Sequence, residues 1–157
     1  SVMKKYLSPI LFYTLLGFIL DILNNLSEYF FSFSFPFDNE EVLGMSKMEI
    51  FTTTVIVAPI IETLFFQAIF FQGLLNFDFF LRNKWLIVLI SASVFASLHG
   101  YSLHYILFAF YGGLILGIAY LKTMEKSNYK NAIIVVFFIH FLRNLIVFLL
   151  VDIFQIL

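Results

Sequence analysis

Long hydrophobic stretches separated by short polar segments dominate the pattern of this chain. Five of them approach the roughly 20 residues that a helix needs to cross a bilayer. The stretches run from about Tyr6 to Leu26, Glu49 to Leu75, Trp85 to His99, Tyr101 to Leu121 and Asn131 to Phe154. The third is short, and we expect it to borrow a turn at one end. The pattern predicts an all-α, polytopic transmembrane helical bundle of about five spans.

No internal repeat or low-complexity linker divides this pattern, so residues 1–157 are predicted to form a single transmembrane domain. The first span covers residues 6–26, and residues 27–45 form an outer loop. Within this loop, residues 30–37 alternate aromatic and small polar side chains. An edge strand would fit this alternation, but we favour a segment in the headgroup region, where aromatic side chains are enriched.

Composition agrees with a membrane protein. Hydrophobic residues make up 62% of the chain and charged residues 12%, whereas soluble domains are about half apolar and about a quarter charged. The net charge of −1 argues against a nucleic-acid partner, which would require a basic face. The absence of cysteine from the sequence excludes disulfides, thiolate metal sites and a cysteine nucleophile.

The distribution of basic residues predicts the orientation of an integral membrane protein. Lysine and arginine are enriched in cytoplasmic loops. With five spans, all basic segments except Lys47 fall on one side, so we expect a cytoplasmic N-terminus and an outside C-terminus. These segments carry Lys4 and Lys5, then Arg82 and Lys84, then Lys122, Lys126 and Lys130.

Three of the spans contain polar groups at depth, which are costly in a bilayer and are functional candidates for that reason. Glu62 lies in the second span, His99 ends the third, and His140, Arg143 and Asn144 lie in the fifth. At a rise of about 1.5 Å per residue, Glu62, His99 and Asn144 are each about 21 Å from the inner edge, and His140 is about 15 Å. The sequence therefore predicts a polar active-site layer inside the membrane.

Each of these residues also has a non-catalytic interpretation. His99 alone would be an interfacial group, as we expect for His104, and Glu62 alone is as often a hydrogen-bonded clasp between helices. Asp21 and Asp152 lie near the ends of spans, where we expect water to reach them. Taken together, however, a carboxylate, two imidazoles and a carboxamide supply a base, proton carriers and an oxyanion donor.

Three motifs lie in order along these spans. Glu62-Thr63-Leu64-Phe65-Phe66-Gln67 is followed by Phe95-Ala96-Ser97-Leu98-His99 and then by His140-Phe141-Leu142-Arg143-Asn144. They resemble the E-E-x-x-x-R, F-x-x-x-H and H-x-x-x-N or H-x-x-x-D motifs of the CAAX prenyl protease type 2 and bacteriocin-processing (CPBP, Abi) family of intramembrane proteases. The resemblance covers about residues 48–150.

Two positions depart from the family pattern. Thr63 replaces the second glutamate, and Gln67 replaces the arginine. Arg143 lies three residues from His140 and so near its helix face. We therefore hypothesise that Arg143 supplies the missing cation.

The resemblance implies an intramembrane endopeptidase that hydrolyses a peptide bond with an activated water. Glu62, assisted by His99, would deprotonate the water, and His140 and Asn144 would donate to the oxyanion. No metal or other cofactor is expected, although Glu62, His99 and His140 could form a zinc site with an open position. The spacing H-E-x-x-H, which would support zinc, is absent from the sequence.

A different class of function stays open, because Thr63 and Gln67 depart from the pattern. A non-catalytic membrane protein of the same fold would use the polar layer to bind a peptide or partner, for instance in bacteriocin immunity or regulation. A proton-coupled transporter is less favoured, since no repeat-related halves are evident. The short, phenylalanine-rich chain resembles bacterial members, so we expect the bacterial cell membrane and membrane-associated peptide or protein substrates such as leader peptides.

Overall fold

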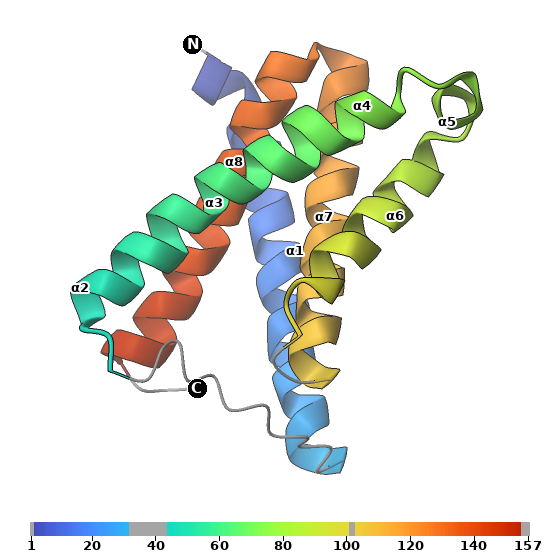
Figure 1. Cartoon of the computed structure of the whole chain (residues 1–157). Helices are drawn as coiled ribbons and strands as arrows, with labels where there is room; N and C mark the ends of the chain where they lie inside the picture. The colour runs from blue at the N-terminus through green and yellow to red at the C-terminus, as the bar shows by residue number, and fades with distance from the viewer. Residues whose placement is uncertain (1, 32–43, 101–102, 155–157) are drawn as a thin grey trace.

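The structure, a computed structural model, describes residues 2–31, 44–100 and 103–154. Throughout these ranges the regular elements are helices, and strands are absent from them. The helices pack side by side and antiparallel as a bundle (Figure 1). The predicted all-α polytopic bundle is therefore confirmed.

Five long helical segments correspond to the five predicted stretches. They are α1 (Val2–Phe31), a continuous second helix from Lys47 to Leu74, α6 (Lys84–Ser97), α7 (Leu103–Lys126), and α8 (Tyr129–Phe148) extended by η3 (Leu149–Ile153). The second helix alternates ordinary and wider π-type turns: α2 (Lys47–Ile50), η1 (Phe51–Val57), α3 (Ala58–Glu62), η2 (Thr63–Phe71) and α4 (Gln72–Leu74). A short α5 (Asp78–Arg82) joins it to α6.

Four of these segments are long and apolar enough to cross a membrane. The exception is α6, whose 14 residues extend for about 21 Å, less than the hydrocarbon thickness of about 30 Å. It is short, as expected from the sequence. Two points stay predictions: the crossing of the bilayer by α6, and the side of the membrane on which each terminus lies.

The helix α7 lies at the centre of the bundle, packed against α1, α6 and α8 (Figure 1). Two glycines allow α6 to approach it closely. A Cβ atom at Gly113 would lie 2.9 Å from Ala92 Cα, and one at Gly117 would lie 3.1 Å from Val88 Cγ1. Small residues four apart are a common way for helices to approach within a membrane. The larger buried cluster joins α1, α7 and α8 through residues such as Ile10, Tyr120 and Ile139.

The ends of the helices that carry the basic residues lie together. The N-terminal end of α1, the start of α6 and the junction of α7 with α8 lie at the upper end of the bundle in Figure 1. Lys84 Nζ lies 3.5 Å from Glu125 Oε1, and Lys122 Nζ lies 5.4 Å from the Trp85 ring centroid. The arrangement is the one that the predicted topology requires.

The helix that carries the first span is longer than the predicted span of residues 6–26. The candidate span is Lys4–Asn24, and the helix continues to Phe31, so residues 27–31, which we assigned to the outer loop, are helical. Residues 27–31 contain no proline or glycine to end the helix. The rest of the aromatic segment that we assigned to the headgroup region, from residue 32 on, lies outside the described residues.

Candidate active site

The second helix carries Glu62, and its start is fixed by a capping box. The Ser46 hydroxyl accepts a hydrogen bond from the Glu49 backbone N–H at 3.3 Å, and the Glu49 carboxylate accepts one from the Ser46 N–H at 2.7 Å. This reciprocal pairing satisfies two donors at the helix N-terminus. Immediately after it, the hydroxyls of Thr52, Thr53 and Thr54 each donate to the carbonyl four residues earlier. Such side-chain bonds compete with the backbone pattern, and here the helix widens into η1.

Pro59 leaves one carbonyl in this wide segment without a helical partner. The Ala58 N–H donates to Thr53 O, five residues earlier. The same step would pair Thr54 O with the N–H of residue 59, but proline has none. Asn144 of α8 supplies the missing donor, from Nδ2 to Thr54 O at 2.8 Å. Because a carbonyl only accepts, this bond fixes which end of the Asn144 carboxamide carries the nitrogen.

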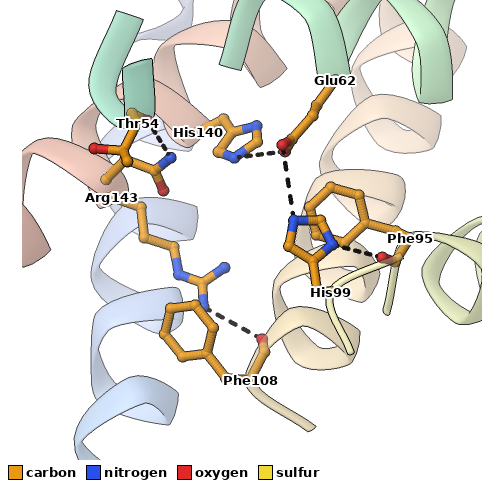
Figure 2. Close-up of polar contacts among 8 residues, drawn as sticks. Thr54, Glu62, Phe95, His99, Phe108, His140 and Arg143 are labelled. Atoms are coloured by element: carbon orange, nitrogen blue, oxygen red, sulfur yellow. Dashed lines mark hydrogen bonds and ion pairs between the residues drawn. The ribbon is translucent and has the colours of Figure 1, made fainter. Parts of the chain in front are cut away.

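Glu62 lies between the two histidines of the predicted layer. Its Oε1 is 3.7 Å from His99 Nε2 and its Oε2 is 3.4 Å from His140 Nε2. Figure 2 shows the Glu62 carboxylate with His140 to its left and His99 below it. The three residues come from three separate parts of the bundle, and their proximity confirms that these polar groups meet. Their catalytic roles stay a prediction.

The surroundings of Nδ1 differ between the two imidazoles and indicate where each ring carries its proton. His99 Nδ1 lies 2.7 Å from Phe95 O, and because the carbonyl only accepts, Nδ1 carries a proton. His99 Nε2 is therefore the nitrogen that exchanges a proton with Glu62 or with a water beside it. His140 Nδ1 is buried without a hydrogen-bond partner among the described residues. When Nε2 of a neutral His140 ring carries the proton, this N–H points to the Glu62 carboxylate and only the acceptor Nδ1 is unpaired. The other tautomer would leave a buried N–H donor without an acceptor.

Phe95 packs against both imidazoles. Its ring centroid lies 4.3 Å from that of His99 and 6.2 Å from that of His140. Phe66 also packs against Phe95, with the centroids 5.1 Å apart. The aromatic position of the second motif therefore forms part of the wall beside the polar layer.

A cavity of about 250 Å³ opens over this layer. Glu62, His99, His140, Arg143 and Asn144 are among its lining residues, together with aliphatic, aromatic and small residues. Liquid water occupies roughly 30 Å³ per molecule, so the space admits several waters or part of a peptide chain. The other lining residues are Met45, Ile50, Thr53, Thr54, Ala58, Phe95, Tyr105, Phe108 and Ala109.

The two positions that depart from the family motif do not face this cavity. Thr63 is buried and lines a separate apolar hollow beside α8. Its hydroxyl has no hydrogen-bond partner in the described part of the chain. Gln67 is also buried and does not line the cavity. Successive helical residues are about 100° apart, so the residue after Glu62 points to another face.

Groups of three or more His, Asp or Glu side chains that could hold a metal ion do not occur within the residues described. Glu62 lies close enough to each histidine for a direct or water-mediated interaction. The zinc alternative therefore gains no geometric support from this arrangement.

Comparison with known families gives the chain an assignment. A model of the family described as type II CAAX prenyl endopeptidase Rce1-like matches residues 45–146, well over half of the chain. The chain belongs to this Rce1-like family. Searches of curated proteins and of solved structures found no match. The Rce1-like region contains Glu62, His99, His140 and Asn144, which form the cavity's polar layer.

An ion pair between Arg143 and Asp21, which lies outside the Rce1-like region, corrects two of our predictions. Arg143 donates from Nε to Asp21 Oδ2 at 2.8 Å and from Nη2 to Asp21 Oδ1. Both side chains are buried. Our expectation that water reaches Asp21 is therefore wrong. Arg143 is directed away from Glu62 toward Phe108 (Figure 2), whose ring centroid lies 4.4 Å from Cζ. It therefore does not supply a cation to the glutamate.

Two glycines make room for this arginine. A Cβ atom at Gly112 would lie 2.1 Å from Arg143 Nη1, and one at Gly17 would lie 3.1 Å from Arg143 Cδ. Asp21 and Gly17 are four apart on α1 and so share a face. Sequence reasoning missed this group because Asp21 was placed near a helix end. The available signal was the recurrence of Thr14, Asp21 and Asn24 on one side of α1.

Proposed function

We propose that the protein is an intramembrane endopeptidase that hydrolyses a peptide bond with water activated by Glu62. The observation that carries this proposal is the position of the Glu62 carboxylate between His99 Nε2 and His140 Nε2 in a cavity inside the bundle. A carboxylate and imidazoles within reach of one another are suited to accept and return the proton of an attacking water. Membership of the Rce1-like family supports the same class of reaction.

In the proposed reaction, a water beside Glu62 loses a proton to the carboxylate as its oxygen attacks the scissile carbonyl carbon. The C–N bond then breaks, and the nitrogen of the leaving amine receives that proton. The water oxygen remains in the new carboxyl group. The fixed Nδ1 proton of His99 leaves Nε2 to share the transferred proton with Glu62.

Asn144 and His140 are the proposed donors to the oxyanion of the tetrahedral intermediate. One N–H of Asn144 donates to Thr54 O, and the second on the same nitrogen remains for substrate. His140 Nε2–H borders the same cavity and is directed at the Glu62 carboxylate, and we propose that it turns to the oxyanion once the carboxylate has taken the proton of the water. Each donor of this kind is worth about 3–4 kcal/mol in hydrolases where it has been removed. We propose no metal in this reaction.

The proposed substrates are membrane-associated peptides or proteins. The first candidates to test are small membrane peptides and leader peptides of a bacterial membrane. Glu62, His140 and Asn144 lie within helices that are apolar enough to span a bilayer, so we expect a substrate to enter the cavity from within or beside the membrane. The cavity is small, with a volume of about 250 Å³, which favours an extended peptide backbone over a folded domain.

The test compares Glu62→Gln with Asp78→Asn in purified protein reconstituted in lipid. Both changes convert a carboxylate to a carboxamide, but Asp78 is exposed in the connection before α6. Cleavage of a library of single-span peptides, read by mass spectrometry, should fall at least about a hundredfold for Glu62→Gln because it lacks the base. It should be unchanged for Asp78→Asn.

A reaction in ¹⁸O-labelled water distinguishes the proposed role of Glu62 from a nucleophilic one. Direct attack by water places the label in the new product carboxylate and leaves Glu62 unlabelled after one turnover. Label in Glu62 would show a covalent intermediate instead. Wild-type protein that binds the peptides without cleaving them would favour the alternative of a non-catalytic peptide-binding protein.

A further inference from the structure

A second polar hollow lies at the end of the bundle where the basic residues gather. It has a volume of about 470 Å³ and lies between the first turns of α1 and the last turns of α7. Lys5, Lys122 and Lys126 border it, and Pro9, Phe12 and Tyr13 form its apolar part. It shares no lining residue with the cavity at Glu62.

The charges around this hollow are unbalanced. Its lining contains three lysines and no acidic residue. Lys5 and Lys126 have no carboxylate within 4 Å in the portion of the chain that is described. Lys122 Nζ is 3.9 Å from Glu125, but the same carboxylate also lies 3.5 Å from Lys84. Two of the three ammonium groups are therefore available to an anion.

The hollow also changes from charged to apolar with depth. Lys5 and Lys126 lie at the ends of two membrane-spanning helices. Phe12 is seven residues further along α1, which places it about 10 Å deeper, and its side chain is 59% exposed. Serine and threonine hydroxyls of Ser8 and Thr123 lie between these levels. A ligand that fits this gradient has an anionic head and an apolar chain.

We propose that this hollow is a binding site for an anionic phospholipid, with its phosphate between Lys5 and Lys126 and the start of an acyl chain against Phe12. Basic pockets between helices at the membrane surface recognise lipid headgroups through this combination of charge and depth. Ser8 and Thr123 are in position to donate hydrogen bonds to the phosphate oxygens. A free phosphate shares the charge but has no chain to cover Phe12.

The experiment measures phosphatidylglycerol retained by the purified protein, by native mass spectrometry, with phosphatidylcholine as the comparison of zero net charge, because its choline group offsets the phosphate. A lysine near the membrane surface is worth about 1 kcal/mol, or about fivefold in affinity. Lys5→Gln and Lys126→Gln should each weaken phosphatidylglycerol binding about fivefold, and the double variant about thirtyfold. Phosphatidylcholine binding should change little.

Lys130→Gln is the matched control, because Lys130 lies at the same end of the bundle but does not line the hollow. It should leave retention unchanged. An equal loss for Lys130→Gln would indicate a general surface attraction and would overturn the proposal. Displacement by millimolar inorganic phosphate as readily as by phosphatidylglycerol would identify a free-phosphate site and also overturn it. Circular dichroism confirms that each variant is folded, and the readout is independent of proteolysis.

Discussion

The buried ion pair between Asp21 and Arg143 makes a quantitative prediction about stability. Asp21 and Arg143 are each 5% exposed, and the guanidinium donates two hydrogen bonds to the carboxylate. Asp21→Asn keeps the shape of the side chain but leaves the arginine charge without its anion. Removing one partner of a buried pair typically costs about 3–5 kcal/mol. We expect about 3 kcal/mol, because the ring and carbonyl of Phe108 continue to interact with the guanidinium.

A second variant, Gly112→Ala, perturbs the same ion pair by displacing Arg143 instead of changing Asp21. In Gly112→Ala the new Cβ would lie 2.1 Å from Arg143 Nη1, so the guanidinium must shift by about 1.3 Å to reach an ordinary contact near 3.4 Å. A shift of that size is enough to break the 2.8 Å bond from Nε to Asp21. Overpacking of this kind costs about 1–3 kcal/mol.

The assay is unfolding of purified protein in mixed micelles by a denaturing detergent, followed by circular dichroism. The double variant Asp21→Leu with Arg143→Leu removes both charges and fills the space with apolar groups. Such replacements are often neutral or stabilising, so the double variant should be at least as stable as the wild type. The reasoning would be refuted by Asp21→Asn within about 0.5 kcal/mol of wild type, the range of ordinary surface substitutions.

Three further predictions concern the active site and the packing around it. Pro59→Ala supplies an N–H that competes with Asn144 for Thr54 O, so peptide cleavage should fall at least about tenfold while the fold is retained. Adding Asn144→Ala to this variant should cause little further loss of cleavage. Gly113→Ala should destabilise the bundle by about 1–3 kcal/mol in the detergent assay because it forces α6 away from α7, whereas Gly73→Ala, whose Cβ would meet nothing within 4 Å, should not. Chelator treatment that removes all bound zinc, checked by elemental analysis, should leave cleavage unchanged; loss of cleavage restored by zinc would contradict the proposed metal-free reaction.

The sequence predicted the polar layer because regular helix geometry turns residue counts into depth. Glu62 and His99 were expected at the same level, and the structure places them in contact. Arg143 was assigned to the wrong partner for a geometric reason. A residue three positions after His140 lies about 60° to one side of it, and this offset directs the guanidinium to α1 instead of to Glu62.

Other features depended on contacts between distant segments. Asp21 and Arg143 are 122 residues apart, and no local pattern names a partner at that separation. The bond from Asn144 to Thr54 O required two facts together, a proline without an N–H and a wide helical turn before it. The turn type depends on packing and on the threonine hydroxyls, so sequence periodicity alone did not predict it.

The shortness of α6 has a consequence for the membrane around the protein. Its 14 residues leave about 9 Å of a typical hydrocarbon layer unspanned, and His99 lies just beyond its last turn. A short apolar segment is accommodated by local thinning of the bilayer. Lipids beside α6 are therefore expected to be compressed toward the level of Glu62, which brings interfacial water to the polar layer from that side. The proposed hydrolysis should then depend on the acyl-chain length of the lipids and be faster in thinner bilayers.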